Sequence, residues 1–257
     1  MSERTPIVAG NWKMNKTLEP ARELAGAVAE ASDEVGDVEL IVSPVGPYLR
    51  AVGRTMEGSD VGLAAQNVHW AESGSYTGEV SPTMLRDIGC SHAIIGHSER
   101  RQYFGETDVS VNRRARAALE HDLTAIICVG ESLAERKGGD TELKIKLQVR
   151  AALSEVPRSL ARNVIIAYEP LWAIGTGESA TPEQAQDAHS TIRQLMAGLY
   201  DQDLADATRI LYGGSVKPHN IDGLIEQPDL DGALIGGASL DADSFLSIAR
   251  SVQDYVG

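Results

Sequence analysis

Residues 163–168 read NVIIAY, a nearly unbroken apolar run that ends at Glu169-Pro170. A strand covered on both faces is apolar along its whole length, whereas a half-exposed strand alternates between apolar and polar residues. Seven further short runs of this kind are bounded by turn residues: PIVAG (6–10), VELIVS (38–43), VGLAAQ (61–66), HAII (92–95), TAIICV (124–129), RILY (209–212) and GALI (232–235). The sequence therefore predicts eight parallel strands that are buried on both faces.

Helical patterns fill the gaps between these runs. Residues 17–31 keep a helical period behind Thr17, which we predict as an N-cap, and residues 243–256 form the last helix. Thr181-Pro182 and Ser81-Pro82 each combine a capping residue with a proline suited to the first helical position. Strands that alternate with helices in this way are typical of a parallel α/β architecture.

Eight strand–helix pairs predict a closed (β/α)8 TIM barrel in which residues 1–257 form a single domain. The alternative is an open doubly wound sheet. That fold usually carries a Gly-rich dinucleotide turn after its first strand, and here the chain reads Gly10-Asn11-Trp12-Lys13 instead. The barrel is the better interpretation.

The composition favours a globular protein with a substantial core, since 42% of the 257 residues are hydrophobic and 23% are charged. The formal net charge of −14 makes partners such as nucleic acid or an anionic membrane a poor expectation. The two cysteines, Cys90 and Cys128, lie far apart in apolar company and are predicted as buried reduced thiols. With neither a leader-like segment nor an apolar run of membrane-spanning length, we expect a cytoplasmic protein.

In a barrel of this kind the residues that follow the strands meet at one rim, where the active site lies. The residues at that rim that can carry chemistry are Asn11, Lys13, His97, Glu169, the turn Gly213-Gly214-Ser215 and the pair Gly236-Gly237. Each alone is a weak indication, because a lone lysine, histidine or glutamate is usually structural or solvated. Together they suit acid–base chemistry on a small phosphorylated substrate, with the glycine turns holding the phosphate.

Two of these residues have an informative local setting. His97 lies between a predicted strand and a predicted helix start, where the helix dipole disfavours the imidazolium form. Glu169 follows the apolar 163–168 run and precedes Pro170, which favours a partly desolvated general base. The other histidines show no metal-ligand spacing, so we expect no metal site among His69, His92, His121, His189 and His219. We expect no cofactor either, because Lys13, His97 and backbone dipoles can stabilise the negative charge of an intermediate.

Five segments resemble signatures of the triosephosphate isomerase family and occur in its order: NWKMN (11–15), GHSERR (96–101), AYEPLWAIGTG (167–177), YGGSV (212–216) and LIGGAS (234–239). The resemblance extends from about Ile7 to the final helix. It implies an isomerase of glycolysis and gluconeogenesis that interconverts dihydroxyacetone phosphate and D-glyceraldehyde 3-phosphate through an enediolate. This family is itself a standard example of an enzyme that pairs a glutamate base with a neutral histidine.

The resemblance also implies a role for each site residue. Glu169 is similar to the base that moves a proton between C1 and C2, and His97 to the neutral electrophile that protonates the enediolate oxygens. Lys13 resembles the cation that stabilises the developing charge, with Asn11 beside it as a donor that also contacts substrate. The positions whose backbone N–H groups hold the phosphate are matched by Gly175, Ser215, Gly236 and Gly237.

Residues 170–180 resemble the lid of the family, and Ile174 and Leu234 match an apolar pair over the base that we expect to raise its basicity. Leu171 and Glu178 depart from common family residues, which bears on lid kinetics rather than on the chemistry. Residues 67–80 resemble a loop that inserts into a second subunit.

That loop predicts a homodimer with a contact near Thr77, and a tetramer, which the family also contains, is the alternative. Two alternatives to the triose isomerase remain at this point. One is another phosphate-binding aldose–ketose isomerase built on the same barrel, and the other is a barrel without catalytic activity.

Overall fold

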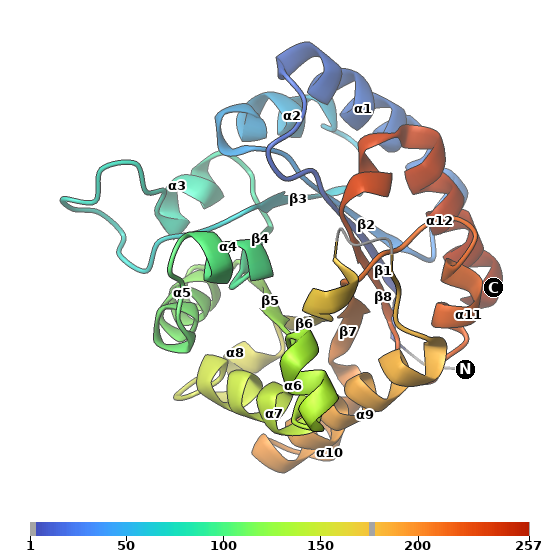
Figure 1. Cartoon of the computed structure of the whole chain (residues 1–257). Coiled ribbons are helices and arrows are strands. Elements are labelled where there is room, and N and C mark those ends of the chain that lie inside the picture. Colours follow the sequence, from blue (N-terminus) through green and yellow to red (C-terminus); the bar gives the residue numbers. More distant parts are fainter. Residues whose placement is uncertain (1–3, 175–177, 257) are drawn as a thin grey trace.

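The computed structural model describes residues 4–174 and 178–256 and contains a closed barrel of eight parallel strands. The strands are β1 (Ile7–Asn11), β2 (Glu39–Ser43), β3 (Gly62–Ala65), β4 (His92–Ile95), β5 (Thr124–Val129), β6 (Val164–Tyr168), β7 (Arg209–Tyr212) and β8 (Gly232–Ile235). Ile7 pairs with Gly232, so the last strand closes the barrel on the first (Figure 1). The predicted barrel is confirmed, and each strand lies within one residue of its predicted run.

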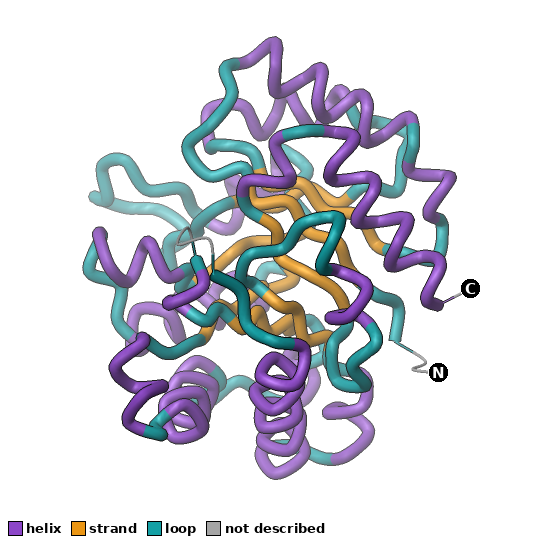
Figure 2. Tube along the Cα trace, turned by 45° about the vertical axis from the view of Figure 1, so that its right-hand side comes forward, coloured by secondary structure: helices purple, strands orange, loops and turns teal. Residues whose placement is uncertain are grey.

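Helices surround the strands on all sides (Figures 1 and 2). They are α1 (Leu18–Glu30), α2 (Leu49–Thr55), α3 (Pro82–Asp87), α4 (Ser98–Tyr103), α5 (Asp108–Glu120), α6 (Leu133–Gly138), α7 (Thr141–Ala152), α8 (Arg158–Ala161), α9 (Pro182–Leu199), α10 (Gln202–Ala207), α11 (Ile221–Ile225) and α12 (Ala242–Val256). Four short 3₁₀ turns are η1 (Ser32–Val35), η2 (Gly46–Tyr48), η3 (Leu171–Ala173) and η4 (Gly237–Leu240). No helix of the described part is long and apolar enough to cross a membrane.

The strands carry two apolar layers, which explains why their sequences do not alternate. In β4, Ile94 points into the barrel and Ile95 packs against the helices, and both are buried. The interior layer consists of Ile7, Ala9, Ile41, Ala64, Ile94, Ile126, Cys128, Ile165, Ala167, Leu211 and Leu234. A strand between two such layers gains from an apolar side chain at every position.

The helix starts agree with the sequence in two cases and differ in one. Thr181 accepts a hydrogen bond from the backbone N–H of Gln184 at the start of α9, and Ser81 accepts one from that of Met84 at the start of α3. Thr17 precedes α1 in extended backbone, but its side chain makes no capping hydrogen bond. Thr17 is thus the N-cap residue by position, as predicted, but its side chain does not make the capping hydrogen bond.

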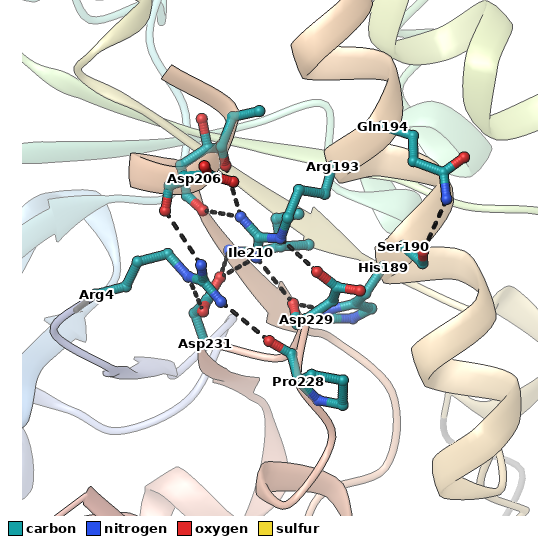
Figure 3. Close-up of polar contacts among 12 residues, drawn as sticks. Arg4, His189, Ser190, Arg193, Gln194, Asp206, Ile210, Pro228, Asp229 and Asp231 are labelled. Atoms are coloured by element: carbon teal, nitrogen blue, oxygen red, sulfur yellow. Dashed lines mark hydrogen bonds and ion pairs between the residues drawn. The ribbon is translucent and has the colours of Figure 1, made fainter. Parts of the chain in front are cut away.

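A buried ionic cluster joins β7, β8 and α9 to the segment that enters β1 (Figure 3). Asp231, which is 3% exposed, accepts hydrogen bonds from Arg193 Nη2 at 2.7 Å and from the backbone N–H of Ile210 at 2.8 Å. It also forms an ion pair with Arg4 Nε. Asp231 directly precedes β8, so this cluster lies at the amino ends of the strands, the end of the barrel opposite the candidate site.

Both cysteines are free and buried, as predicted. Burial raises the pKa of the Cys90 thiol to about 12. Burial also raises the pKa of Cys128, and the nearby Glu169 carboxylate adds to that effect. Both thiols are therefore held in the neutral, unreactive form.

Candidate active site

A cavity of about 300 Å³ opens at the carboxyl ends of the strands. It is lined by Asn11, Lys13, His97, Glu169, Ile174, Gly213, Gly214, Ser215, Val216, Lys217, Leu234, Gly236, Gly237 and Ala238. The structure thus brings every predicted site residue among the described ones into one cavity. Gly175, also predicted to hold the phosphate, lies outside the described residues.

Glu169 follows β6 and is 2% exposed. Its Oε1 lies 2.9 Å from His97 Nε2, and its Oε2 accepts a hydrogen bond of 2.8 Å from the backbone N–H of Ser98. Burial raises the pKa of this carboxyl most strongly, but His97, the Ser98 N–H and Lys13 together lower it below its usual value. Glu169 is therefore held as a carboxylate in this structure.

Ile174 and Leu234 both line the cavity, as the resemblance implied. We expected them to raise the basicity of Glu169 by excluding water. Burial is indeed the largest single influence on the pKa of Glu169, but the polar partners outweigh it here.

His97 precedes α4, so its ring lies beside the free N–H groups of a helix start. Its Nδ1 accepts a hydrogen bond of 3.3 Å from the backbone N–H of Glu99, which requires a ring nitrogen without a proton. Burial lowers the pKa of His97, but the Glu169 carboxylate outweighs burial and the net pKa is raised. The net shift is therefore opposite to the one expected from the helix start alone, because the Glu169 carboxylate stabilises the imidazolium.

The His97–Glu169 pair gives a testable pH dependence. The pKa of His97 is raised from its ordinary value of 6.5, and that of Glu169 is lowered from its ordinary value of 4.5. The pair therefore stabilises the fold fully between pH 4.5 and pH 6.5. This contribution disappears as the pH rises through the raised pKa of His97 or falls through the lowered pKa of Glu169. In Glu169→Gln we expect the His97 ring to titrate at lower pH, because a neutral amide does not stabilise imidazolium.

NMR titration of the histidine rings measures this change directly. His189 is a built-in control, because burial lowers its pKa to about 3 and it stays neutral in both proteins near pH 6. An identical His97 titration in wild type and variant would contradict the coupling. Urea unfolding of both proteins between pH 4 and 8 checks the stability window.

Lys13 adopts a left-handed backbone conformation with φ of 52°, which is uncommon for a residue with a side chain. Its N–H donates to Asn11 Oδ1 at 3.0 Å, and its carbonyl accepts from Gln66 Nε2 at 2.8 Å. Its Nζ lies 2.6 Å from Glu99 Oε1. These contacts hold the ammonium group at the cavity. They also stabilise a strained backbone conformation, and such strain is common at functional sites.

The two glycine turns approach the acid–base residues closely. A Cβ added to Gly213 would lie 2.9 Å from Glu169 Cγ and 3.1 Å from the Tyr168 carbonyl oxygen, so no larger residue fits without a shift. A Cβ added to Gly236 would lie 3.8 Å from Lys13 Nζ. The backbone of both turns is thus within a few ångströms of the charged side chains.

Both ends of the predicted lid are tied to the barrel. At its start, Trp172 Nε1 donates to Glu131 Oε1 at 3.0 Å, and the Tyr168 hydroxyl donates to the same oxygen at 3.0 Å. At its end, the backbone N–H of Ala180 donates to the Tyr212 hydroxyl at 3.1 Å. Of the predicted lid tip, residues 173–175, Ala173 and Ile174 are described, whereas Gly175 lies outside the described residues.

The remaining histidines lie outside the cavity. His92 and His121 each lie 3.2 Å from a carboxylate, Glu39 and Glu72 respectively, and His189 is fully buried. Within residues 4–174 and 178–256 no cluster of histidine, cysteine and acidic side chains is arranged to hold a metal ion.

Sequence reasoning missed several residues that support the site. Ser98 contributes its backbone N–H, Glu99 pairs with Lys13, and Gln66 holds the Lys13 carbonyl. The role of Ser98 could have been predicted from the helix start, because the first backbone N–H groups of a helix have no partner within the helix. Nothing in the sequence identified Glu131, a fully buried carboxylate that binds the lid residue Trp172.

Residues 6–252 match the family model described as triosephosphate isomerase. The chain belongs to the triosephosphate isomerase family. Among similar proteins carrying that name, one from Chloroflexus aurantiacus is 56% identical over 245 residues, covering 95% of this chain and 98% of its own. Others come from Pelobacter propionicus and Trichlorobacter lovleyi, at 54% and 53% identity, and for each 96% of this chain and 98% of the relative are covered.

Membership in the triosephosphate isomerase family decides between the functions that the residues left open. The chain is an isomerase that interconverts dihydroxyacetone phosphate and D-glyceraldehyde 3-phosphate, a step of glycolysis. The alternatives of a different sugar-phosphate isomerase and of a non-catalytic barrel are set aside.

Proposed function

We propose that Glu169 carries the proton between C1 and C2 of the triose phosphate, while His97, Lys13 and Asn11 stabilise the enediolate. The observation that carries this proposal is the placement of a buried carboxylate 2.9 Å from an imidazole Nε2, with a lysine in the same cavity. These are the groups that an enediolate intermediate needs: a base, a proton donor for its oxygens and a cation.

The proton steps balance without any change in oxidation state overall. Glu169 takes the C1 proton of dihydroxyacetone phosphate, and the electron pair of that C–H bond forms the C1–C2 double bond of the enediolate. The N–H at His97 Nε2 supplies a proton to the C2 oxygen and recovers one from the C1 oxygen. Glu169 then returns its proton to C2. The Glu99 N–H bonded to Nδ1 of His97 favours the neutral ring that this exchange requires.

Before the first step, Glu169 leaves His97 and Ser98, which bind both of its oxygens in this structure. The carbonyl of the substrate then takes the place of the carboxylate at His97 Nε2. This exchange explains how one imidazole serves first as partner of the base and then as proton donor to the substrate.

The phosphate is proposed to lie against the backbone N–H groups of Gly175, Ser215, Gly236 and Gly237, with Lys13 nearby. Three of these four residues line the cavity, and Gly175 belongs to the lid segment that would close over it. Backbone dipoles hold an anion without adding basic side chains. This accounts for a phosphate site in a protein whose formal charge is −14.

The proposal is tested by the rate at which purified protein converts glyceraldehyde 3-phosphate, with NADH-dependent reduction of the ketone product as the readout. Rapid conversion that persists in chelator is expected. The protein should also gain thermal stability from 2-phosphoglycolate, which mimics the enediolate and binds only the folded state. A well-folded protein that neither converts the substrate nor binds this analogue would contradict the proposed site.

We also propose a homodimer in which residues 67–80 insert beside Asn11 and Lys13 of a second copy. Supporting this, residues 72–80 are all exposed, and the loop between β3 and α3 extends away from the barrel (Figure 1). Met14, next to Lys13, is 90% exposed. A second copy would cover this apolar side chain.

Substituting Thr77→Arg is expected to convert the dimer to a monomer, because it places a large charge in the proposed contact. Activity should fall with it, since the partner loop would no longer support Asn11 and Lys13. Gln202→Arg, on the exposed face of α10, adds the same charge and should leave a dimer. Analytical ultracentrifugation of both variants gives the answer, and a dimeric Thr77→Arg protein would place the contact elsewhere.

The free, buried state of Cys90 and Cys128 fits a reducing compartment, so we place the protein in the cytoplasm. We also propose that residues 1–257 together form one domain.

A further inference from the structure

Asn220 occupies the N-cap position of α11, but its side chain does not cap that helix. An asparagine at this position usually accepts a hydrogen bond from one of the first backbone N–H groups of the helix. Here the amide is turned back onto the preceding loop. Its Oδ1 accepts from the backbone N–H of Lys217 at 2.8 Å, and its Nδ2 donates to the Ser215 carbonyl at 2.9 Å.

These two bonds fix two successive peptide groups. The Ser215 carbonyl belongs to the peptide that joins residues 215 and 216, and the Lys217 N–H belongs to the next one. The backbone N–H of Asn220 also donates to the Lys217 carbonyl at 3.1 Å, which closes the loop on itself. Ser215, Val216 and Lys217 all line the cavity, so the clamped segment is part of its wall.

We propose that Asn220 is a positioning residue for phosphate binding: it holds residues 215–217 in the shape that presents the Ser215 N–H to the substrate phosphate. This inference rests on the proposed phosphate site at Ser215. Asn220 itself does not line the cavity, so it acts through the loop rather than by touching the ligand. In the described part of the chain, no other side chain is bonded to the Ser215 carbonyl or the Lys217 N–H.

The physical reason is preorganisation. A loop already held in its binding shape loses little conformational freedom when the phosphate arrives, so more of the contact energy appears as affinity. Without the clamp, the loop must be ordered by the ligand. The diverted amide also leaves α11 without its side-chain cap, which costs helix stability and indicates that the bond to the loop is the stronger alternative.

The chain offers a matched control in Asn112 on α5. Its Nδ2 donates to the carbonyls of Ala152 and Ser154 at 3.0 and 2.8 Å, so it also makes two backbone bonds. Asn112 does not line the cavity. Asn112→Ala and Asn220→Ala therefore remove comparable bonds, one distant from the proposed phosphate and one next to it.

The experiment measures kcat and KM for glyceraldehyde 3-phosphate, the Kd of 2-phosphoglycolate, turnover of unphosphorylated glyceraldehyde, and melting temperature. Both variants should melt at lower temperature. Only Asn220→Ala should raise KM and Kd. The expected increase is about tenfold, which corresponds to the net contribution of one hydrogen bond to binding. Its kcat and its turnover of glyceraldehyde should stay near wild type, because neither depends on ordering the phosphate loop. If Asn220→Ala does not fold, Asn220→Ser supplies the same comparison.

Equal Kd values for wild type and the Asn220 variant would overturn the inference. So would an equal loss on glyceraldehyde, since that would indicate a general structural role. Failure of the wild-type protein itself to bind 2-phosphoglycolate is a different result, which would overturn the proposed phosphate site and this inference together.

Discussion

Glu169→Gln should lower kcat by roughly 10²–10⁴-fold, the range associated with a positioned general base, while 2-phosphoglycolate still binds. The amide has nearly the shape of the carboxylate, and its oxygen can still accept the Ser98 N–H that now reaches Oε2 at 2.8 Å. It cannot take a proton from carbon. The variant therefore separates the proton transfer from the binding of the intermediate analogue.

Stopped-flow or coupled kinetics gives kcat, and calorimetry gives the Kd of the analogue. Glu106→Gln is a suitable control, because Glu106 is also a buried carboxylate, 7% exposed and paired with Arg100, but does not line the cavity. It should lose stability and keep its kcat within a few-fold. A Glu169→Gln enzyme with wild-type kcat would mean that another group is the base.

Asp231→Asn is expected to cost about 3–5 kcal/mol of unfolding free energy, the usual effect of removing one partner from a buried ion pair. Asp231 is the shared acceptor for Arg193, Arg4 and the backbone N–H of Ile210, so its neutralisation removes the negative charge from two ion pairs at once, while Arg193 keeps its pair with Asp229 (Figure 3). Denaturant unfolding measures the loss. The KM of the remaining folded enzyme should not change, because the cluster lies at the other end of the barrel from the cavity.

Asp243→Asn on α12 makes the same chemical change at an exposed site. Its effect on stability should stay within about 0.5 kcal/mol, as for other surface substitutions. Similar losses in the two variants would show that the ionic cluster contributes no more than an ordinary surface charge.

Most of the fold was predictable because each strand carries its own signal. The 163–168 run is apolar at nearly every position, and the structure shows why: Ile165 faces the barrel interior while Ile166 packs against the helices. Helix starts were less secure. Thr17 and Thr181 look alike in sequence, but only Thr181 makes a capping bond, with Gln184 three residues later completing the reciprocal pair.

For the candidate site, the residues could be predicted from the sequence, but the contacts between their side chains could not. The order of strands placed Lys13, His97 and Glu169 on one rim. It did not reveal that Glu169 lies 2.9 Å from His97. This contact determines the direction in which the pKa of each group is shifted, so the shifts could not be predicted either. The left-handed backbone conformation of Lys13 could not be predicted from the sequence either, because it depends on partners such as Gln66. Such contacts join positions far apart in the chain, and residue types alone do not specify them.

The seam between β1 and β8 also bears on how the protein is made. Ile7 and Gly232 pair directly, so β1 receives its second neighbour only after the seven strands that follow it have been synthesised. Until then the nascent sheet has an open edge at β1, which neighbouring βα units alone cannot close. Long-range pairings of this kind form slowly and leave partly assembled sheets prone to aggregation. The pairing of β8 with β1 is therefore the late step that turns an open sheet into a closed barrel.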